Sequence, residues 1–168
     1  MSAGTRAVVG SGMHPDTALV LQGLGADGGD FRARQLHEAF IDGADLTLTM
    51  TRAHRRDVLE RAPRNLVRTF TLREAAVLLS GLQRDCREKG GALRDRARAL
   101  VAALAAERAR RPPGDDDVPD PINRALEVHE EVGELIVSAL LPILSRLADL
   151  VVPTDDFGSA PRTGSPDA

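Results

Sequence analysis

Short apolar runs alternate with longer amphipathic segments along the first half of the chain. Residues 45–50 (DLTLTM) and 66–72 (LVRTFTL) are rich in apolar and β-branched side chains, which predicts two buried strands. The segments after them, 51–63 and 73–82, have helical spacing, with Thr51 placed as an N-cap. Strands that alternate with helices at this spacing predict βαβ units and a mainly parallel sheet.

The region before these strands is predicted to hold a Gly-rich loop and two helices. Residues 2–12 (SAGTRAVVGSG) indicate the end of a strand that runs into a loop. A helix is predicted from Pro15 to a stop at Gly25, and residues 31–44 predict a turn and a short helix. The apolar face of the first helix is expected to hold Ala18, Leu19, Leu21 and Leu24.

The second half of the chain is predicted to be mostly helical. Residues 84–111 carry nine Lys or Arg and four Asp or Glu, which indicates a basic helix, broken at Gly90 and Gly91, that is solvated or neutralised by its own acidic residues and the nearby Asp run. Residues 122–150 have the clearest helical pattern, in which Pro142 should introduce a kink. The apolar stripe of this helix is Val128, Val132, Leu135, Ile136, Ala139, Leu140, Ile143 and Leu147.

The composition limits the class of protein. With 168 residues, 42% apolar and 28% charged, we expect one α/β domain over 1–152 and a disordered tail over 153–168. There is no signal-peptide pattern and no apolar run of the ~20 residues that a membrane span needs, so we expect a cytoplasmic protein without a membrane partner. A net charge of −3 argues against nucleic acid as a partner. Arg outnumbers Lys by 21 to 1, which indicates a GC-rich, bacterial coding sequence.

The cysteine and the histidines predict neither a metal site nor a cofactor. A single cysteine, Cys86, leaves no internal disulfide and no multi-cysteine metal site. His37 and His129 are isolated in the sequence, His14 belongs to a helix entry, and no two histidines have the i, i+4 spacing of a metal-binding helix.

The acidic stretch GDDDVPDP (114–121) has two interpretations. In the first, Asp120 is an N-cap, Pro121 takes the first helical position, and Asp115, Asp116 and Asp117 form a solvated loop. In the second, Asp120 moves a proton, which requires a nucleophile that faces it.

Four ordered stretches support the second interpretation, because together they resemble the low-molecular-weight protein tyrosine phosphatases. The resemblance implies a small doubly wound α/β fold with a four-stranded, mostly parallel sheet. In this family the thiolate of a Cys-X5-Arg loop attacks phosphorus, and a later Asp before a Pro protonates the leaving phenolate. That Asp corresponds to Asp120. The stretches are SAGTRA at 2–7, RARQL at 32–36, ADLTLTMTRAHR at 44–55 with RTFTLREAA at 68–76, and DVPDP at 117–121.

The resemblance also assigns supporting residues and shows departures from the family. Ser2 matches a serine that supports the phosphate loop. Ile122 and Asn123 stand where the family often has aromatic side chains that flank the substrate, and Phe31 replaces a histidine that helps to hold the loop. The thioredoxin-coupled arsenate reductases share this fold and stay an alternative.

The largest departure is a missing unit. In the family, the first strand, the phosphate loop and the first helix, roughly 30 residues in all, would precede SAGTRA. Cys86 does not replace it, because the required arginine position holds Ala92. The chain as printed is therefore expected to be inactive. It is a shortened phosphatase for phosphotyrosine proteins or small phosphomonoesters, a pseudo-phosphatase that binds a partner, or an unrelated α/β module.

Overall fold

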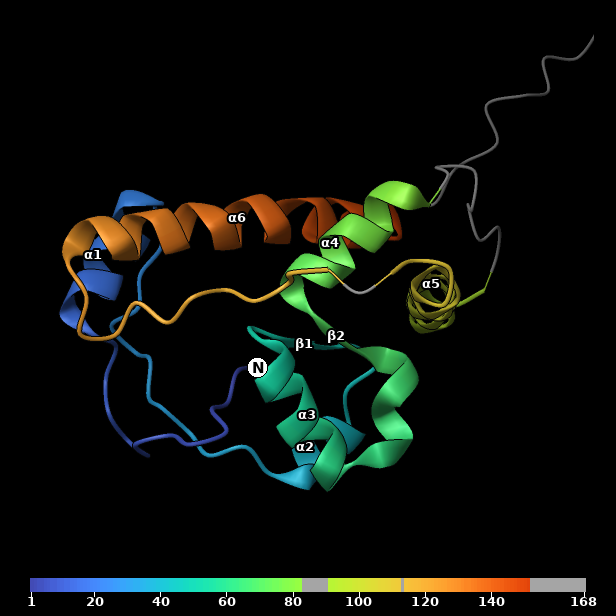
Figure 1. Ribbon diagram of the computed structural model, residues 1–168, viewed down its shortest axis with the longest axis horizontal. Helices are drawn as coiled ribbons and strands as arrows, with labels where there is room; N and C mark the ends of the chain where they lie inside the picture. Colours follow the sequence, from blue (N-terminus) through green and yellow to red (C-terminus); the bar gives the residue numbers. More distant parts are fainter. Residues whose placement is uncertain (83–90, 113, 152–168) are drawn as a thin grey trace, which may run out of the picture.

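A pair of short parallel strands lies at the centre of the computed structural model, which describes residues 1–82, 91–112 and 114–151 (Figure 1). Strands β1 (Thr47–Thr49) and β2 (Thr69–Thr71) pair in the register Thr47 with Thr69 and Thr49 with Thr71. Both predicted strands are therefore confirmed, in shorter form. Cys86, Gly90 and the tail 153–168 lie outside the described residues.

After each strand, a threonine caps the helix that follows. Thr51 Oγ1 accepts a hydrogen bond from His54 N (3.0 Å) and caps α3 (Arg52–Arg61), which confirms the predicted cap. Thr71 Oγ1 accepts from Glu74 N (3.1 Å), and the Glu74 carboxylate accepts from Thr71 N (3.2 Å), so a capping box starts α4 (Leu72–Gly81). Both helices consequently begin at the carboxyl edge of the sheet.

The segment before β2 is helical where the sequence predicts strand. Pro63–Arg68 forms the 3₁₀-helix η1, because Pro63 stands at its start with a fixed φ. The Thr69 hydroxyl donates to Asn65 O (2.8 Å) and closes this turn, so β2 keeps only three residues.

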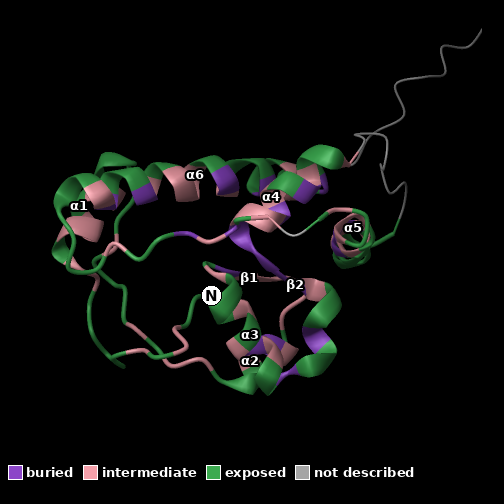
Figure 2. Ribbon diagram, viewed as in Figure 1, coloured by how far each residue is buried: buried purple, intermediate pink, exposed green. Residues whose placement is uncertain are grey.

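Helices cover both faces of the strand pair, as expected of a doubly wound fold (Figure 1). On one face, α4, α5 (Leu93–Arg108) and α6 (Leu126–Asp149) enclose Phe70. On the other face lie α2 (Glu38–Asp42) and α3. Figure 2 shows that buried positions lie on β2 and on the helices around it. The main core consists of Phe70, Leu72, Ala75, Leu78, Val101, Leu104, Ala139 and Ile143.

The apolar stripe predicted for the last helix is confirmed in its main part. Val132, Ala139 and Ile143 are buried on α6, and the helix continues through Pro142. His129, which the stripe did not include, is buried on the same helix. No helix of the described residues is long and apolar enough to cross a bilayer.

Helix α1 (Pro15–Gly23) packs against α6 through a glycine. A Cβ added at Gly133 would lie 2.6 Å from Val20 Cγ1, so the two helices approach as closely as they do only because Gly133 has no side chain. The predicted apolar face of α1 is wrong at two positions, because Leu19 and Leu24 are 56% and 51% exposed. No residue of α1 is buried, because α6 covers only part of the helix and leaves the other apolar side chains exposed.

The first residues form a bridge with a later segment. Gly4 N donates to Arg34 O (2.9 Å), Leu36 N donates to Gly4 O (2.8 Å), and Gly4 pairs in parallel with Gln35. The Gln35 amide extends the contact by donating to Thr5 O (2.8 Å). The predicted strand end at residues 2–12 is thus an isolated bridge. Among the described residues, only β2 pairs with β1.

We expect Gly133→Ala to destabilise the packing of α1 on α6. The new methyl group gains up to about 1 kcal/mol of helix propensity but overpacks against the stiff Val20 side chain, at a cost of about 1–3 kcal/mol. Urea denaturation should therefore show a net loss of stability. Gly23→Ala is the matched control, because no atom lies within 4 Å of its added Cβ. A stable Gly133→Ala protein, or no recovery in the double variant with Val20→Ala, would contradict the close packing.

Candidate functional site

The acidic stretch 114–121 passes along the carboxyl edge of the sheet. Val118 N donates to Met50 O (2.8 Å), just after β1, and the Val118 side chain is buried. Ligands of doubly wound sheets bind in the crevice outside the carboxyl ends of the strands. The stretch therefore lies where a site is expected in this fold.

Two arginines hold this stretch in place. The Asp117 carboxylate accepts from Arg52 N (2.7 Å) and from Arg52 Nε (3.2 Å), and Arg73 donates to the Asp117 carbonyl (2.9 Å). The hydrogen bond from the Arg52 backbone, followed by that from its side chain, lowers the pKa of Asp117, and Asp117 in turn raises the pKa of Arg52. Asp115 contacts the same guanidinium at 3.3 Å. The expected solvated loop is therefore wrong for Asp116, which is buried, whereas Asp117 is ion-paired but stays partly exposed.

Asp120 lies in an exposed turn beyond this anchor. Its Oδ1 accepts from Ile122 N (3.0 Å), and Asn123 has the left-handed φ of 61°. Helix α6 begins only at Leu126, so the interpretation of Asp120 as its N-cap is wrong. The local Asx turn uses the carboxylate, and the left-handed Asn123 keeps the chain out of helix. Ile122 and Asn123 are exposed in the same turn as Asp120.

The remaining residues assigned by resemblance lie in the N-terminal segment. Ser2 is exposed and precedes the bridge between Gly4 and Gln35. Phe31 is exposed, and its backbone N donates to Gly28 O (3.0 Å). The structure therefore shows Ser2 and Asp120 as accessible side chains.

An arginine-lined cavity of about 210 Å³ lies beside the acidic stretch. Arg55 and Arg108 each donate to Thr69 O at 3.0 Å, and the Arg108 guanidinium lies 4.5 Å from the centroid of the Phe70 ring. Burial, followed by the charge of Arg55, lowers the pKa of Arg108, whereas Glu74 acts in the opposite direction. The charged side chains around the cavity are Arg52, Arg55, Arg108, Arg111, Glu74 and Asp116.

Arg108 departs from the expectation for the basic segment, because its side chain is only 21% exposed. Arg108 also donates to Leu66 O (2.8 Å), so its guanidinium joins α5 to the backbone before and within β2. At the other end of α5, Arg94 and Arg98 form ion pairs with Asp45 at 2.9 and 2.8 Å. These arginines attach the helix to the sheet, a role that a count of charges does not reveal.

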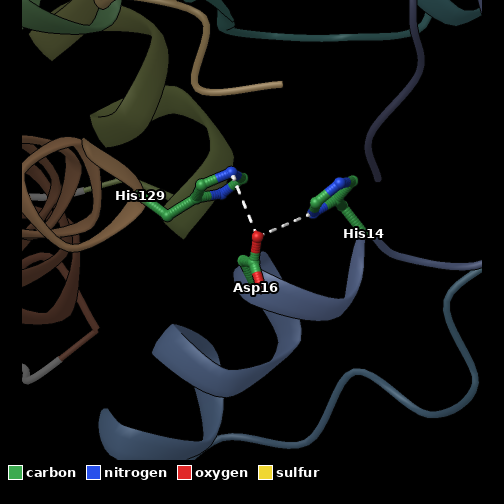
Figure 3. Close-up of side chains that lie close together, drawn as sticks. All are labelled: His14, Asp16 and His129. Atoms are coloured by element: carbon green, nitrogen blue, oxygen red, sulfur yellow. Dashed lines mark ion pairs between the residues drawn. The ribbon is translucent and has the colours of Figure 1, made fainter. Parts of the chain in front are cut away.

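The structure also gathers three groups that the sequence leaves apart. His14 and Asp16 at the start of α1 meet His129 of α6 (Figure 3). Asp16 Oδ2 lies 3.8 Å from His14 Nδ1 and 3.9 Å from His129 Nε2. His129 is therefore not isolated, and only the packing of α1 on α6 reveals the cluster.

Comparison with known proteins supports the family resemblance. The model of the low molecular weight phosphotyrosine protein phosphatase family matches residues 1–77. Comparison with curated protein sequences gives no match. Asp120 lies beyond the matched residues.

Solved structures extend the likeness over most of the chain. The YwlE arginine phosphatase from Geobacillus stearothermophilus has a TM-score of 0.63 and 23% identity, over 89% of this chain and 73% of its own. The low molecular weight protein tyrosine phosphatase from T. tengcongensis has a TM-score of 0.61 and 24% identity, over 87% and 76%. The tyrosine phosphatase AmsI from Erwinia amylovora gives 0.61 and 18%, over 88% and 73%. The resemblance and the fold class are confirmed: the chain has the fold of the low-molecular-weight phosphatases.

We expect the Asp117–Arg52 clamp to make stability depend on pH. Because the folded pKa of Asp117 lies below 3.8, the clamp stabilises fully above about pH 4 and is lost as the pH falls through the folded pKa. Asp117→Asn should lower the urea midpoint at pH 7 and should lower it by less at pH 3, where the clamp begins to be lost. Asp30→Asn, which removes an exposed carboxylate, is the control. An equal deficit at both pH values would contradict the clamp.

We expect Arg108→Gln to destabilise the protein by about 1–3 kcal/mol, because two charge-assisted hydrogen bonds to backbone carbonyl oxygens are lost, of which the one to Thr69 O is partly buried. Arg108→Lys should restore only a minor part, since an ammonium group does not reproduce the planar fork over Phe70. The readout is chemical denaturation. Arg110→Lys is the control at a side chain that is 74% exposed. Full stability of Arg108→Lys would contradict the role of the fork.

Proposed function

We propose that the chain forms the general-acid side of a cysteine-dependent phosphatase of the low-molecular-weight class, with Asp120 as the acid. The observation that carries the proposal is the anchored acidic stretch. Hydrogen bonds of Val118 with Met50 and of Asp117 with Arg52 fix it across the carboxyl edge of the sheet. Asp120 follows this anchored stretch by two residues and has an exposed side chain, which supports a place for it beside the edge of the sheet that would carry the phosphate loop.

The chemistry requires a nucleophile that faces Asp120. A thiolate attacks phosphorus, the ester P–O bond breaks, and the carboxyl proton of Asp120 passes to the leaving oxygen. Cys86 does not supply the thiolate, because the matching arginine position is Ala92. We place the Cys-X5-Arg loop in a segment outside these 168 residues, with Ser2 as its support. The 168 residues by themselves are then inactive.

The substrate class follows from the leaving group that Asp120 protonates. We propose a phosphotyrosine protein or a small phosphomonoester, handled in the bacterial cytoplasm without a cofactor. Ile122 and Asn123 lie exposed beside Asp120 and would flank the leaving group. The similar structures include an arginine phosphatase as well as tyrosine phosphatases, so phosphoarginine belongs in the substrate test.

We expect the purified 168-residue chain to show no turnover of p-nitrophenyl phosphate above the buffer rate, because no thiolate lies in a phosphate-binding loop. The Cys86→Ser variant is assayed in parallel with the wild type. Turnover by the wild type that disappears in Cys86→Ser would show that Cys86 is a nucleophile and would refute this part of the proposal.

A chain extended at its N-terminus by a strand–loop–helix unit with Cys-X5-Arg tests Asp120 directly. We expect activity, and we expect Asp120→Asn to lower kcat on phenyl phosphate by about 10²–10⁴-fold. The loss should be smaller for p-nitrophenyl phosphate, whose leaving group needs less protonation. Asp115→Asn, in the same acidic stretch, is the control.

Other outcomes of this experiment would favour the alternatives. An extended chain that binds phosphotyrosine peptides without hydrolysis would indicate a pseudo-phosphatase. Arsenate reduction coupled to thioredoxin would indicate an arsenate reductase. Equal loss of activity for both substrates in Asp120→Asn would remove Asp120 as the general acid.

A further inference from the structure

Two helix surfaces converge on one cluster of nitrogen and oxygen donors. His14 and Asp16 flank the first residue of α1, and His129 lies in the first turns of α6. The ligand atoms of the three side chains lie within 4.8 Å of one another. The close packing of Val20 on Gly133 sets this distance, because it brings α1 against α6.

Two of the three donor atoms are buried without a partner. Among the described residues, His14 Nδ1 and His129 Nε2 have no hydrogen bond, although each atom is shielded from solvent. The whole His129 residue is only 3% exposed. Both nitrogens point toward Asp16 Oδ2, at 3.8 and 3.9 Å, which is too far for a hydrogen bond (Figure 3). Buried nitrogens of this kind require an explanation, since nearly all such groups in native proteins are satisfied.

The second ring nitrogen of His129 orients the first. His129 Nδ1 lies 3.1 Å from Thr17 Oγ1. When Nδ1–H donates to this hydroxyl, the lone pair of Nε2 faces the cluster, as in the outer shell of metal-bound histidines. The imidazole rings of His14 and His129 stack with centroids 5.0 Å apart.

Two imidazoles and one carboxylate are ligands that suit Zn²⁺ and its first-row neighbours better than Mg²⁺ or Ca²⁺. With bonds of about 2.0–2.2 Å, two ligands of a tetrahedral ion lie about 3.4 Å apart. The two distances from Asp16 Oδ2, 3.8 and 3.9 Å, exceed this separation by about half an ångström, and the third pair of ligand atoms lies within 4.8 Å, so side-chain rotation has to bring the three atoms closer together around the ion. Three protein ligands leave a fourth position for water.

We propose that His14, Asp16 and His129 form a zinc site that joins the start of α1 to α6. The ion satisfies both buried nitrogens and neutralises the carboxylate. It also links two helices that are far apart in the sequence. The site consists of residues other than those of the proposed phosphatase chemistry, and its test does not depend on activity.

The test is zinc binding to the metal-stripped full chain, measured by calorimetry and by thermal unfolding. We expect one Zn²⁺ per chain and a rise in Tm of about 5–10 °C at a zinc concentration about 100 times Kd. Mg²⁺ at the same concentration should leave Tm unchanged. Absence of saturable zinc binding, or an equal effect of Mg²⁺, would overturn the proposal.

Variants locate the ion. His14→Ala and Asp16→Asn each remove one metal ligand at a partly exposed position. Each should abolish the zinc-dependent rise in Tm. Thr17→Val should weaken binding by about 10–100-fold through the lost orientation of His129. His54→Ala, at an exposed histidine, is the control and should bind as the wild type. Undiminished binding by His14→Ala and Asp16→Asn would place the zinc elsewhere and refute the site. Because these variants spare the buried His129, the result does not depend on the folding of a core variant.

Discussion

The structure depends on the burial of a strand pair that is too short to persist alone. β1 and β2 have three residues each, and parallel pairs of this size need helices on both faces. Phe70, at the middle of β2, is fully buried against three helices, so it connects the sheet to α4, α5 and α6. The threonine caps after the strands start two helices at one edge, and the acidic stretch is attached to the same edge.

Arginine side chains attach the acidic stretch and helix α5 to the strand pair, and they do so in two different environments. Arg52 acts in solvent, where its backbone N–H and its guanidinium together hold Asp117. Arg108 acts under partial burial, where carbonyl oxygens and an aromatic face replace water around its charge. A guanidinium serves both tasks because its donors form a rigid fork and its charge persists at all relevant pH values.

Local signals predicted those parts of the fold that local chemistry controls. The cap at Thr51, the helix stop at Gly25 (φ 78°) and the buried stripe of α6 follow from neighbouring residues. The start of α6 did not, because Asp120 and Pro121 look like a helix entry, whereas an Asx turn takes the carboxylate.

The candidate site also has one part that local signals predict and another part that they do not. An Asp-Pro motif is readable in the sequence, so Asp120 was predicted as a site residue. The anchoring of its loop by Arg52, the burial of Arg108 and the meeting of His14 with His129 depend on contacts between distant segments. No periodicity or spacing encodes such contacts, and a family resemblance carries only the residues of its own motifs.

The lack of any buried residue in α1 has a consequence for motion. A helix that adds little to the core opens without melting the sheet, so its amide protons exchange through local separation from α6 rather than through global unfolding. The amides of β2, enclosed with Phe70, exchange only when the whole domain unfolds. Helix α1 and the sheet thus belong to two cooperative units of unequal stability, joined across the Gly133 contact.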